Sequence, residues 1–513
     1  MTGESFDGLI SGGRRLTRSE LDERAARAAQ GFIDLGVGPG DSIALFLRND
    51  FAFFEASIAA QRLAAYAVPI NWHFKAEEVD YVLRDCGARI FVVHADLWPI
   101  VAHIVPDRVR VFVAPTPSEI AEAYGVAPDA RGVPAGMQAW DEWVASQRPA
   151  RDLPPPATDS MIYTSGTTGS PKAVRRNPAS PEQAEKSAWI RRTVYGFTSD
   201  MVAGVPGPLY HSAPNSFGLR AAQMGRAVVL LPRFDPEDML KAIERHRISH
   251  MFMVPTMFVR LLKLPGDVRA KYDLSSLRYI IHAAAPCPIE AKRGMIEWWG
   301  PIIHEFYGST ESSAVTLATS ADSLKKPGTV GRPVAGAEIV IVGEDGQEAP
   351  IGAQGEIFTR IAGMPDFTYH NKPDKRVEID RNGLITSGDV GYLDSDGYLF
   401  ICDRKRDMVI SGGVNIYPAE IESVALHMPQ IRDCAVFGIP DDDFGEALMA
   451  VVEPQPGVDL TPDEIRVYLK QHLADYKTPK HIKIASDLPR EDSGKIFKRR
   501  LRDPYWTKAG RTI

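Results

Sequence analysis

One stretch decides the fold of this sequence: Tyr163-Thr164-Ser165-Gly166-Thr167-Thr168-Gly169-Ser170-Pro171-Lys172. Residues 160–163, which lead into this stretch and include its first residue, are typical of a short strand. The two glycines and the proline of the stretch prevent a helix from continuing through it. Glycine lets backbone N–H groups converge on an anion, hydroxyls donate to phosphate oxygens, and lysine adds a positive charge. The stretch therefore predicts a loop that cradles a polyphosphate.

The spacing of its residues distinguishes this loop from a Walker A motif. Gly166, Gly169 and Lys172 form Gly-x-x-Gly-x-x-Lys, whereas Walker A requires Gly-x-x-x-x-Gly-Lys followed by Ser or Thr. The alternative is a surface loop of Ser, Thr and Gly that binds nothing. The ten-residue string is more specific than such a loop, which favours the phosphate cradle.

Length and composition predict a soluble cytoplasmic protein with several domains. A chain of 513 residues is too long for one hydrophobic core. Its 59 basic and 66 acidic residues give a net charge of -7, so no general affinity for nucleic acid or anionic membrane is expected. The four cysteines are widely separated and predict neither disulfides nor a metal site. The sequence contains no recognisable signal peptide and no apolar run long enough for a transmembrane segment.

Helical and strand periodicities alternate along the chain, which predicts an α/β fold. The expected helices cover 21–35, 51–64 and 75–86, and the expected strands cover 42–47, 67–71, 89–93, 202–206, 227–231, 250–254 and 277–282. Strands separated by helices are typical of parallel sheets, and the two groups of strands indicate two sheets. Residues 115–156 are rich in Pro, Ala and Asp, and we interpret them as a linker-like excursion that is moderately ordered at best.

The second half of the chain changes character. After residue 329, short strands separated by Asp-Gly and Asn-Gly turns predict a β-rich subdomain. The last hundred residues alternate helix and strand, and they suffice for a small α+β domain. We predict a large N-terminal domain over 1–403, with two parallel-type α/β sheets and the β-rich subdomain, and a small mobile α+β C-terminal domain over 404–513.

Four further segments follow the cradle in a recognisable order: Tyr307-Gly308-Ser309-Thr310-Glu311, Ser387-Gly388-Asp389, residues 403–417 and residues 489–495. Together with the cradle they resemble the signatures of the adenylate-forming superfamily, which contains acyl- and aryl-CoA synthetases, luciferases and the adenylation domains of peptide synthetases. The matches span about two-thirds of the chain. The chain is most similar to an acyl-CoA synthetase.

The resemblance implies an ATP site built from several segments. The residues assigned to ATP or AMP are Thr164, Ser165, Gly166, Thr167, Thr168, Gly169, Lys172, Ala284, Ala285, Phe306, Tyr307, Gly308, Asp389 and Arg404. A fixed carboxylate such as Asp389 accepts hydrogen bonds from both ribose hydroxyls. Thr310 is implied to contact phosphate in catalysis, and Glu311 to hold Mg²⁺. On the residues alone, 307–311 is better explained as a strand end followed by an N-capped helix.

The resemblance also implies a mobile C-terminal domain. Lys495 is the implied catalytic lysine, which would hold the substrate carboxylate and the α-phosphate together. Arg406 is the implied hinge, and Gly412 and Gly413 are assigned to a tunnel for CoA. A glycine bulge or turn is a serious alternative for this pair. On the residues alone, 489–502 is a solvated basic tail.

The acyl pocket is expected at Tyr210, His211, Ser212 and Asn215. In amino-acid-activating relatives an Asp in this segment pairs with the substrate ammonium, and His211 stands at the matching position. An ammonium without a partner in a pocket is costly, so we expect a plain carboxylic acid. His211 is expected to act in catalysis as a gate between the ATP site and the acyl pocket, and a core histidine is the alternative.

We therefore expect an ATP-dependent carboxylic acid–CoA ligase. It would form acyl-AMP and pyrophosphate, then acyl-CoA and AMP, with ATP, Mg²⁺ and CoA as cofactor and co-substrates. The expected acid is a medium- or long-chain fatty acid or a bulky apolar acid. The alternatives are an aryl-acid CoA ligase, an enzyme that loads a separate carrier protein, a luciferase-type oxygenase and a non-catalytic ATP sensor. For the oligomeric state, a homodimer is one expectation.

Overall fold

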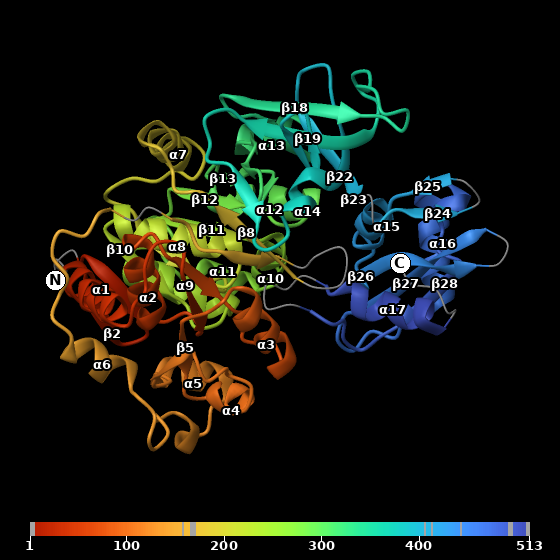
Figure 1. The fold of residues 1–513 in the computed structure, drawn as a ribbon. Coiled ribbons are helices and arrows are strands. Elements are labelled where there is room, and N and C mark those ends of the chain that lie inside the picture. The colour runs from red at the N-terminus through yellow and green to blue at the C-terminus, as the bar shows by residue number, and fades with distance from the viewer. Residues whose placement is uncertain are drawn as a thin grey trace.

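The structure is a computed structural model that describes residues 6–155, 158–164, 171–404, 407–411, 414–441, 444–490 and 496–508. Two parallel sheets, a β-rich unit and a separate C-terminal sheet make up the molecule, and the C-terminal sheet lies to one side of the rest (Figure 1). The predicted fold class, α/β with a β-rich unit and a smaller C-terminal part, is confirmed.

The first sheet contains four parallel strands in the order β4-β3-β5-β6. Their bounds are β3 (Ser42–Phe46), β4 (Tyr66–Pro69), β5 (Ile90–His94) and β6 (Arg110–Ala114), and the helices that accompany them are α1 (Arg18–Asp34), α2 (Phe51–Arg62), α3 (Ala76–Asp85) and α4 (Trp98–Val101). Thr17 caps α1 by accepting a hydrogen bond from the Glu20 N–H, while the Glu20 carboxylate accepts from the Thr17 N–H.

The second sheet has the strand order β13-β12-β11-β9-β10-β1-β2, and all neighbours are parallel except the hairpin β1–β2. The strands are β1 (Gly8–Ser11), β2 (Arg14–Thr17), β9 (Val202–Val205), β10 (Ala227–Leu230), β11 (His250–Met253), β12 (Tyr279–His282) and β13 (Ile303–Glu305). The helices around them are α7 (Pro181–Thr193), α8 (Ser212–Met224), α9 (Pro236–His246), α10 (Pro255–Leu262), α11 (Gly266–Ala270) and α12 (Ile289–Trp299). Parallel pairing places the carboxyl ends of β9, β11, β12 and β13 on one edge of the sheet.

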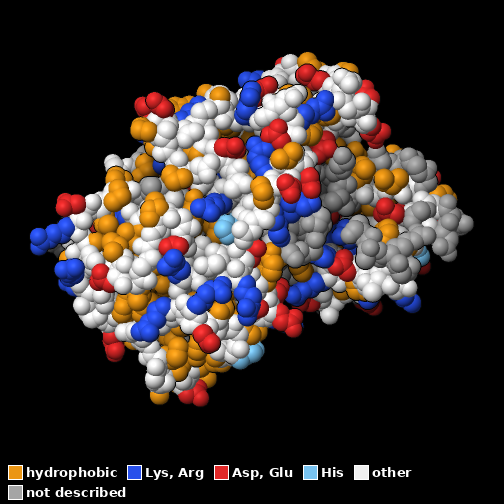
Figure 2. Space-filling model, in the orientation of Figure 1, with side chains coloured by type: hydrophobic (Ala, Val, Ile, Leu, Met, Phe, Trp, Pro, Cys, Tyr) orange, Lys and Arg blue, Asp and Glu red, His pale blue; other side chains and the backbone are white. Residues whose placement is uncertain are grey.

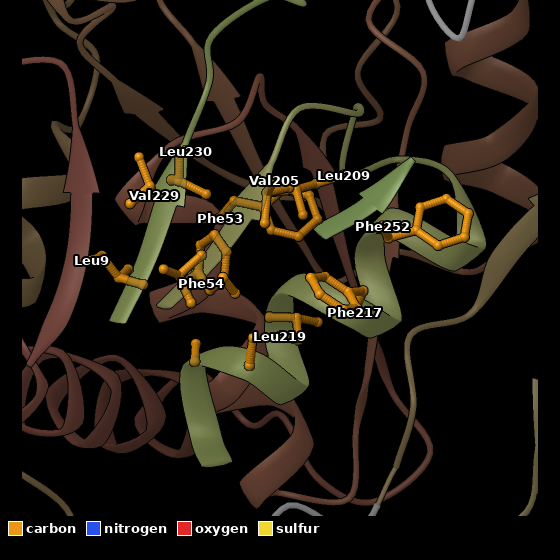
Figure 3. Close-up of a cluster of buried hydrophobic side chains, with 14 of the residues drawn as sticks. Leu9, Phe53, Phe54, Val205, Leu209, Phe217, Leu219, Val229, Leu230 and Phe252 are labelled. Carbon is orange, nitrogen blue, oxygen red and sulfur yellow. The ribbon is translucent and has the colours of Figure 1, made fainter. Parts of the chain in front are cut away.

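Helix α2 is buried almost completely, because it belongs to a core shared by both parallel sheets. Every residue from Phe51 to Gln61 is buried. Its Phe53 and Phe54 pack with side chains of α8 and of the second sheet, including Leu209, Phe217 and Val205 (Figure 3). A helix that is apolar on all sides is stable only inside a core. The burial of α2 therefore joins the two sheets into one unit.

The interpretation of residues 115–156 as a linker-like excursion that is moderately ordered at best is wrong for the described residues 115–155. This segment contains α5 (Ser118–Tyr124), the 3-10 helix Pro128–Ala130 and α6 (Trp140–Ser146). Trp140 is fully buried, and its Nε1 donates a hydrogen bond to Glu55 Oε2 at 2.8 Å. Trp143 packs on Phe112 with 4.1 Å between ring centroids. Two tryptophans on one helix hold the segment to the core, although Pro and Ala dominate its composition.

The β-rich unit is an antiparallel sheet in the order β16-β17-β23-β22-β19-β18, accompanied by a small sheet in the order β20-β8-β7. Its strands are β16 (Thr316–Leu317), β17 (Thr329–Pro333), β18 (Ala337–Val342), β19 (Gly355–Ile361), β21 (Asp380–Arg381), β22 (Leu384–Leu393) and β23 (Leu399–Arg404), with helices α13 (Ser320–Lys325) and α14 (Pro373–Glu378). The small sheet contains β7 (Ile162–Thr164), β8 (Lys172–Arg176) and β20 (Phe367–Tyr369). The predicted β-rich piece after residue 329 is confirmed.

The C-terminal part has its own sheet and core. The strand order is β25-β24-β27-β26, with β28 beside β27. The elements are β24 (Val409–Ser411), β25 (Val414–Ile416), α15 (Pro418–Ala425), β26 (Ile431–Asp441), β27 (Gly445–Pro454), α16 (Pro462–His472), the 3-10 helix Asp475–Lys477, β28 (His481–Ile484) and α17 (Lys498–Lys508).

The interpretation of residues 489–502 as a solvated basic tail is also wrong for its described part from residue 496 onward, while residues 491–495 lie outside the described residues. Helix α17 packs on β26, and Trp506 Nε1 donates to the Gly438 carbonyl at 3.0 Å. Leu501 and Tyr505 lie against a hydrophobic cluster of β26 and β27. Lys498 Nζ lies 2.7 Å from Glu422 Oε1 of α15. The basic residues therefore share a helix whose apolar side covers the sheet.

The molecular surface mixes both signs of charge. Basic and acidic side chains are interspersed over the face shown in Figure 2. Within the described residues, no helix combines the length and the apolar character needed to cross a membrane.

We predict that Trp140→Ala lowers the free energy of unfolding by about 3–5 kcal/mol, because it opens a cavity in the core and removes a hydrogen bond to buried Glu55. Urea unfolding followed by circular dichroism measures this change. The control Trp140→Phe keeps most of the apolar volume, so its loss is expected to be smaller. A loss below about 1 kcal/mol for Trp140→Ala would mean that the segment contributes little to the core.

Candidate functional site

Three of the predicted site segments follow strands of the second sheet. Residues 206–211 follow β9, 283–286 follow β12 and 306–311 follow β13. The Phe306 N–H donates to the His282 carbonyl at 3.1 Å, so the last two segments are direct neighbours. Ligands of open α/β sheets bind outside the carboxyl ends of the strands. This edge of the sheet is therefore the candidate site.

The base of the phosphate cradle is the hairpin of β7 and β8. Thr164 is paired with Lys172, and Thr164 Oγ1 donates to the Lys172 carbonyl at 3.2 Å. Tyr163 donates its hydroxyl to Asp85 at 2.7 Å, and Tyr81 donates to the Pro171 carbonyl at 3.0 Å. Helix α3 therefore holds the hairpin from one side.

Tyr369 connects Lys172 with Glu311. Lys172 Nζ lies 5.3 Å above the centre of the Tyr369 ring, and the Tyr369 hydroxyl donates to Glu311 Oε1 at 2.9 Å. The pKa of Lys172 is lowered overall. Burial is the main cause and the nearby Lys375 adds to it, whereas Glu378 and Glu311 raise the pKa by less. A cation and a carboxylate from segments far apart in the sequence thus share one aromatic neighbour. Such a pair can hold a phosphate and its metal ion.

The segment 307–311 contains the short strand β14 (Gly308–Ser309) and the beginning of a tight turn over 310–312, which leads to the short strand β15 (Ser313–Ala314). The alternative of an N-capped helix is therefore wrong. A side chain on Gly308 would place its Cβ only 1.7 Å from the Ser313 carbonyl oxygen, so glycine is required here. Ser309 Oγ accepts hydrogen bonds from the N–H groups of Glu311 and Ser312. The serine closes the turn from within.

Arg176, at the end of β8, holds the same turn from outside. Its Nη2 donates to the carbonyls of Thr310 and Glu311, both at 2.7 Å, and to Ser313 Oγ at 3.1 Å. Its Nη1 donates to the Pro365 carbonyl at 3.1 Å. The pKa of Arg176 is lowered overall, because burial outweighs the negative charges of Asp159 and Glu311, which raise it. The cradle strand and the turn therefore form one hydrogen-bonded unit.

Asp389 lies in β22 beside the same turn. The Tyr307 hydroxyl donates to Asp389 Oδ2 at 2.8 Å, and the Asp389 side chain is buried. In the antiparallel pairing of β22 with β23, Asp389 stands opposite Arg404. The structure thus brings Tyr307, Asp389 and the backbone of Arg404 together.

The segment 210–215 forms the start of α8. His211 is the N-cap residue of α8, and Tyr210 is buried with its ring 4.6 Å from that of Trp72. Ser212 is half-buried. The Asn215 amide donates to the Leu209 carbonyl at 2.9 Å, so this side chain supports the segment itself. Asn215 therefore has a structural role that the sequence analysis did not assign.

The adenine segment contains one unusual backbone position. Ala284 has a φ of 76°, in the left-handed region, which is uncommon for a residue with a side chain. Ala285 follows it, and Phe306 is buried in the core near Tyr195 and Phe252. The Phe306 ring therefore belongs to the core behind the segment.

Several predicted site residues lie outside the described residues: Ser165, Gly166, Thr167, Thr168, Gly169, Arg406, Gly412, Gly413 and Lys495. The roles that the resemblance assigns to them stay predictions. Thr310 is described, and its carbonyl accepts a hydrogen bond from Arg176 Nη2 at 2.7 Å.

Two family models match this chain. Residues 5–364 match the model described as AMP-binding enzyme, and residues 420–495 match the AMP-binding enzyme C-terminal domain. The chain belongs to the family of AMP-binding enzymes. The predicted membership of the adenylate-forming superfamily is confirmed.

Relatives of this AMP-binding enzyme include several CoA ligases. It is 34% identical over 497 residues to a feruloyl-CoA synthase of an Amycolatopsis species, covering 96% of this chain and 94% of the relative. It is 31% identical to a long-chain-fatty-acid–CoA ligase of Mycobacterium tuberculosis, and the match covers 96% of this chain and 93% of the relative. The structure of o-succinylbenzoate CoA synthetase from Bacillus subtilis with its acyl-adenylate superposes on this chain with a TM-score of 0.79 at 27% identity. The superposition covers 98% of this chain and 96% of the synthetase. The prediction of an acyl-CoA synthetase is confirmed by these relatives.

Sequence analysis missed the residues that support the site of this AMP-binding enzyme. Arg176 follows the cradle closely, but only the structure shows that it reaches 134 residues ahead to Thr310. Tyr369 lies in no motif, and its contact with Glu311 spans 58 residues. A basic residue at the end of the cradle strand was the only available signal. Motifs mark ligand contacts, whereas supporting contacts depend on strand pairing across the chain.

We predict that Arg176→Met reduces kcat/KM for ATP about tenfold or more in pyrophosphate release, because the Thr310–Glu311 turn loses two hydrogen bonds from a buried cation. The matched control is Arg175→Met. Arg175 is the neighbouring arginine, and its guanidinium lies 4.6 Å above the Tyr66 ring. Equal effects of the two substitutions would contradict a specific role for Arg176.

Proposed function

We propose that this AMP-binding enzyme is a carboxylic acid–CoA ligase whose ATP site is the carboxyl edge of the second sheet. The observation that supports this site is the hydrogen-bonded unit formed by β8, the 307–311 turn and β22. Arg176, Tyr369 and Tyr307 connect the three. The unit gathers a cation, two carboxylates and a tight turn at one edge.

The first step would join the acid to AMP. A carboxylate oxygen attacks the α-phosphorus of ATP, and pyrophosphate leaves. Lys172 and the cradle residues would hold the β- and γ-phosphates, Thr310 the α-phosphate, and Asp389 with Arg404 the ribose. Tyr307, Gly308, Ala284 and Ala285 would flank adenine. Lys495 would neutralise the two anions that must approach each other.

Mg²⁺ is the expected metal ion, and Glu311 is its proposed protein ligand. The Tyr369 hydroxyl fixes one Glu311 oxygen, which leaves the carboxylate in a defined orientation. Within the described part of the chain, no group of three or more His, Cys, Asp or Glu side chains could hold a metal ion. Mg²⁺ commonly combines one or two carboxylates with substrate phosphates, which fits a single glutamate. The ion would neutralise charge on the phosphates of ATP.

The second step would transfer the acyl group to CoA. The CoA thiolate attacks the acyl carbon, and AMP leaves with the electrons of the broken C–O bond. We propose that the C-terminal domain, residues 404–513, turns about Arg406 relative to residues 1–403 between the steps. Gly412 and Gly413 would then border the path of CoA. A cytoplasmic location and a homodimer stay predictions.

The acid is proposed to be a fatty or bulky apolar acid, with an aryl acid as the alternative. The names of the relatives span both classes, since one is named for feruloyl-CoA and another for long-chain fatty acids. The proposed acyl pocket has an apolar environment, which is formed by the rings of Tyr210 and Trp72 and by the small residues around His211. A separate carrier protein is the remaining alternative to CoA as acceptor.

We expect the purified protein to release pyrophosphate from ATP and Mg²⁺ with at least one acid of a panel of fatty, aryl and polycyclic acids. Addition of CoA should convert the adenylate into a thioester, and EDTA should abolish pyrophosphate release. Discharge by a holo-carrier protein but not by CoA would favour the carrier alternative. Absence of pyrophosphate release with every acid would favour an ATP sensor.

We also predict that Lys495→Ala abolishes pyrophosphate release but leaves thioester formation from synthetic acyl-AMP largely intact. The reason is that the lysine is needed only where the carboxylate and the α-phosphate must be brought together. The two half-reactions are measured separately on the same preparation. Equal loss of both would contradict the assigned role.

A further inference from the structure

Asn49 lies in the turn between β3 and α2, outside every motif of the sequence analysis. Its buried side chain makes three hydrogen bonds, all with backbone groups of the second sheet's loops. Nδ2 donates to the Gly207 carbonyl at 2.9 Å and to the Leu231 carbonyl at 3.2 Å. Oδ1 accepts from the Leu209 N–H at 2.9 Å. A residue of the first sheet therefore holds a loop of the second.

Leu209, two residues before His211, is held from both sides. Its N–H donates to Asn49, and its carbonyl accepts from the Asn215 amide at 2.9 Å. Its side chain is fully buried in the core cluster with Val205 and Phe217 (Figure 3). Buried backbone groups outside strands and helices need such partners. The main chain that leads into His211 thus depends on two asparagine side chains.

The turn that carries Asn49 is itself fixed by buried charges. Arg48 N–H donates to His94 Nδ1 at 3.0 Å, so the other ring nitrogen of His94 carries the proton and donates to Asp50 Oδ2 at 3.1 Å. Arg14 also donates to Asp50. Burial raises the pKa of Asp50, but His94 and Arg14 outweigh it and lower the pKa to about 2. Asn49 is therefore held between anchored neighbours.

We propose that Asn49 is a positioning residue for acid activation, because it fixes residues 207–209 and through them the placement of Tyr210 and His211. This rests on the proposed function, in which His211 borders the acid. Asn49 itself is buried, and its side chain bonds to backbone groups of the loops. Its loss should therefore weaken the use of the acid more than the use of ATP.

The test is Asn49→Ala, with Ser249→Ala as a matched control. Ser249 is buried at the amino end of the strands of the second sheet, just before β11. There its Oγ accepts a hydrogen bond from the Val202 N–H at 3.0 Å. For Asn49→Ala, the KM for the best acid should rise about tenfold, and the KM for ATP should change less than about threefold. Ser249→Ala should lower the Tm but leave both KM values unchanged. A second variant, Asn49→Asp, keeps the volume and the acceptor for Leu209 and should show the same selective rise.

The outcomes separate the inference from the proposed function. A wild-type protein that releases no pyrophosphate with any acid would overturn both. An active wild type would overturn the inference alone if folded Asn49 variants kept the wild-type KM for the acid. The inference would also be overturned if the variants lost activity only in proportion to the loss of folded protein, or if neither variant folded. Either result would show that Asn49 serves stability.

Discussion

The burial of α2 on all sides is the constraint on which the rest of this structure depends. A helix with no polar face must be enclosed, and here the shared core of both parallel sheets encloses it. The two sheets are thereby fixed relative to each other. The turn that precedes α2 then stands at a defined place beside the loops of the second sheet. Asn49 occupies that turn, so the packing of one helix reaches the loop before His211 through the Asn49 side chain.

A second set of contacts organises the nucleotide side of the site. Arg176, Tyr369 and Tyr307 come from β8, β20 and the start of the 307–311 turn, and each contacts a residue of another segment. Of the three, Arg176 and Tyr369 are assigned no contact with ATP. All three determine where the carboxylates of Glu311 and Asp389 lie. Preorganised carboxylates and donors are effective because they need not rearrange when charge develops.

Much of the fold could be predicted from periodicity, because alternating helices and strands leave strong patterns. The expected strand 42–47 corresponds to β3 and the expected helix 51–64 to α2. The predictions for 115–156 and 489–502 were wrong for a common reason. In both cases composition suggested a polar or irregular chain, whereas a few aromatic residues decide the packing: Trp140 in the first segment, and Trp506 in α17, the helix that begins in the second segment and runs past its end. Composition averages over residues, and a core contact depends on single side chains.

The site was predictable only where residues contact ligands. The motifs identified Lys172, Glu311 and Asp389, and the fold places them near one another. Arg176 and Asn49 act through backbone groups of residues more than a hundred positions away, and such contacts follow from tertiary pairing. A single sequence contains no record of that pairing.

The attachment of α17 has a consequence for how the C-terminal part can move. Arg490 forms ion pairs with Asp433 of β26 and Glu453 of β27, and on the far side of residues 491–495, Lys498 contacts Glu422 of α15. Both flanks of that short segment are thus tied to the same sheet and its helix. Arg490 and α17 therefore move with the C-terminal sheet as one body, and any displacement of the sheet shifts both attachment points of the intervening segment together.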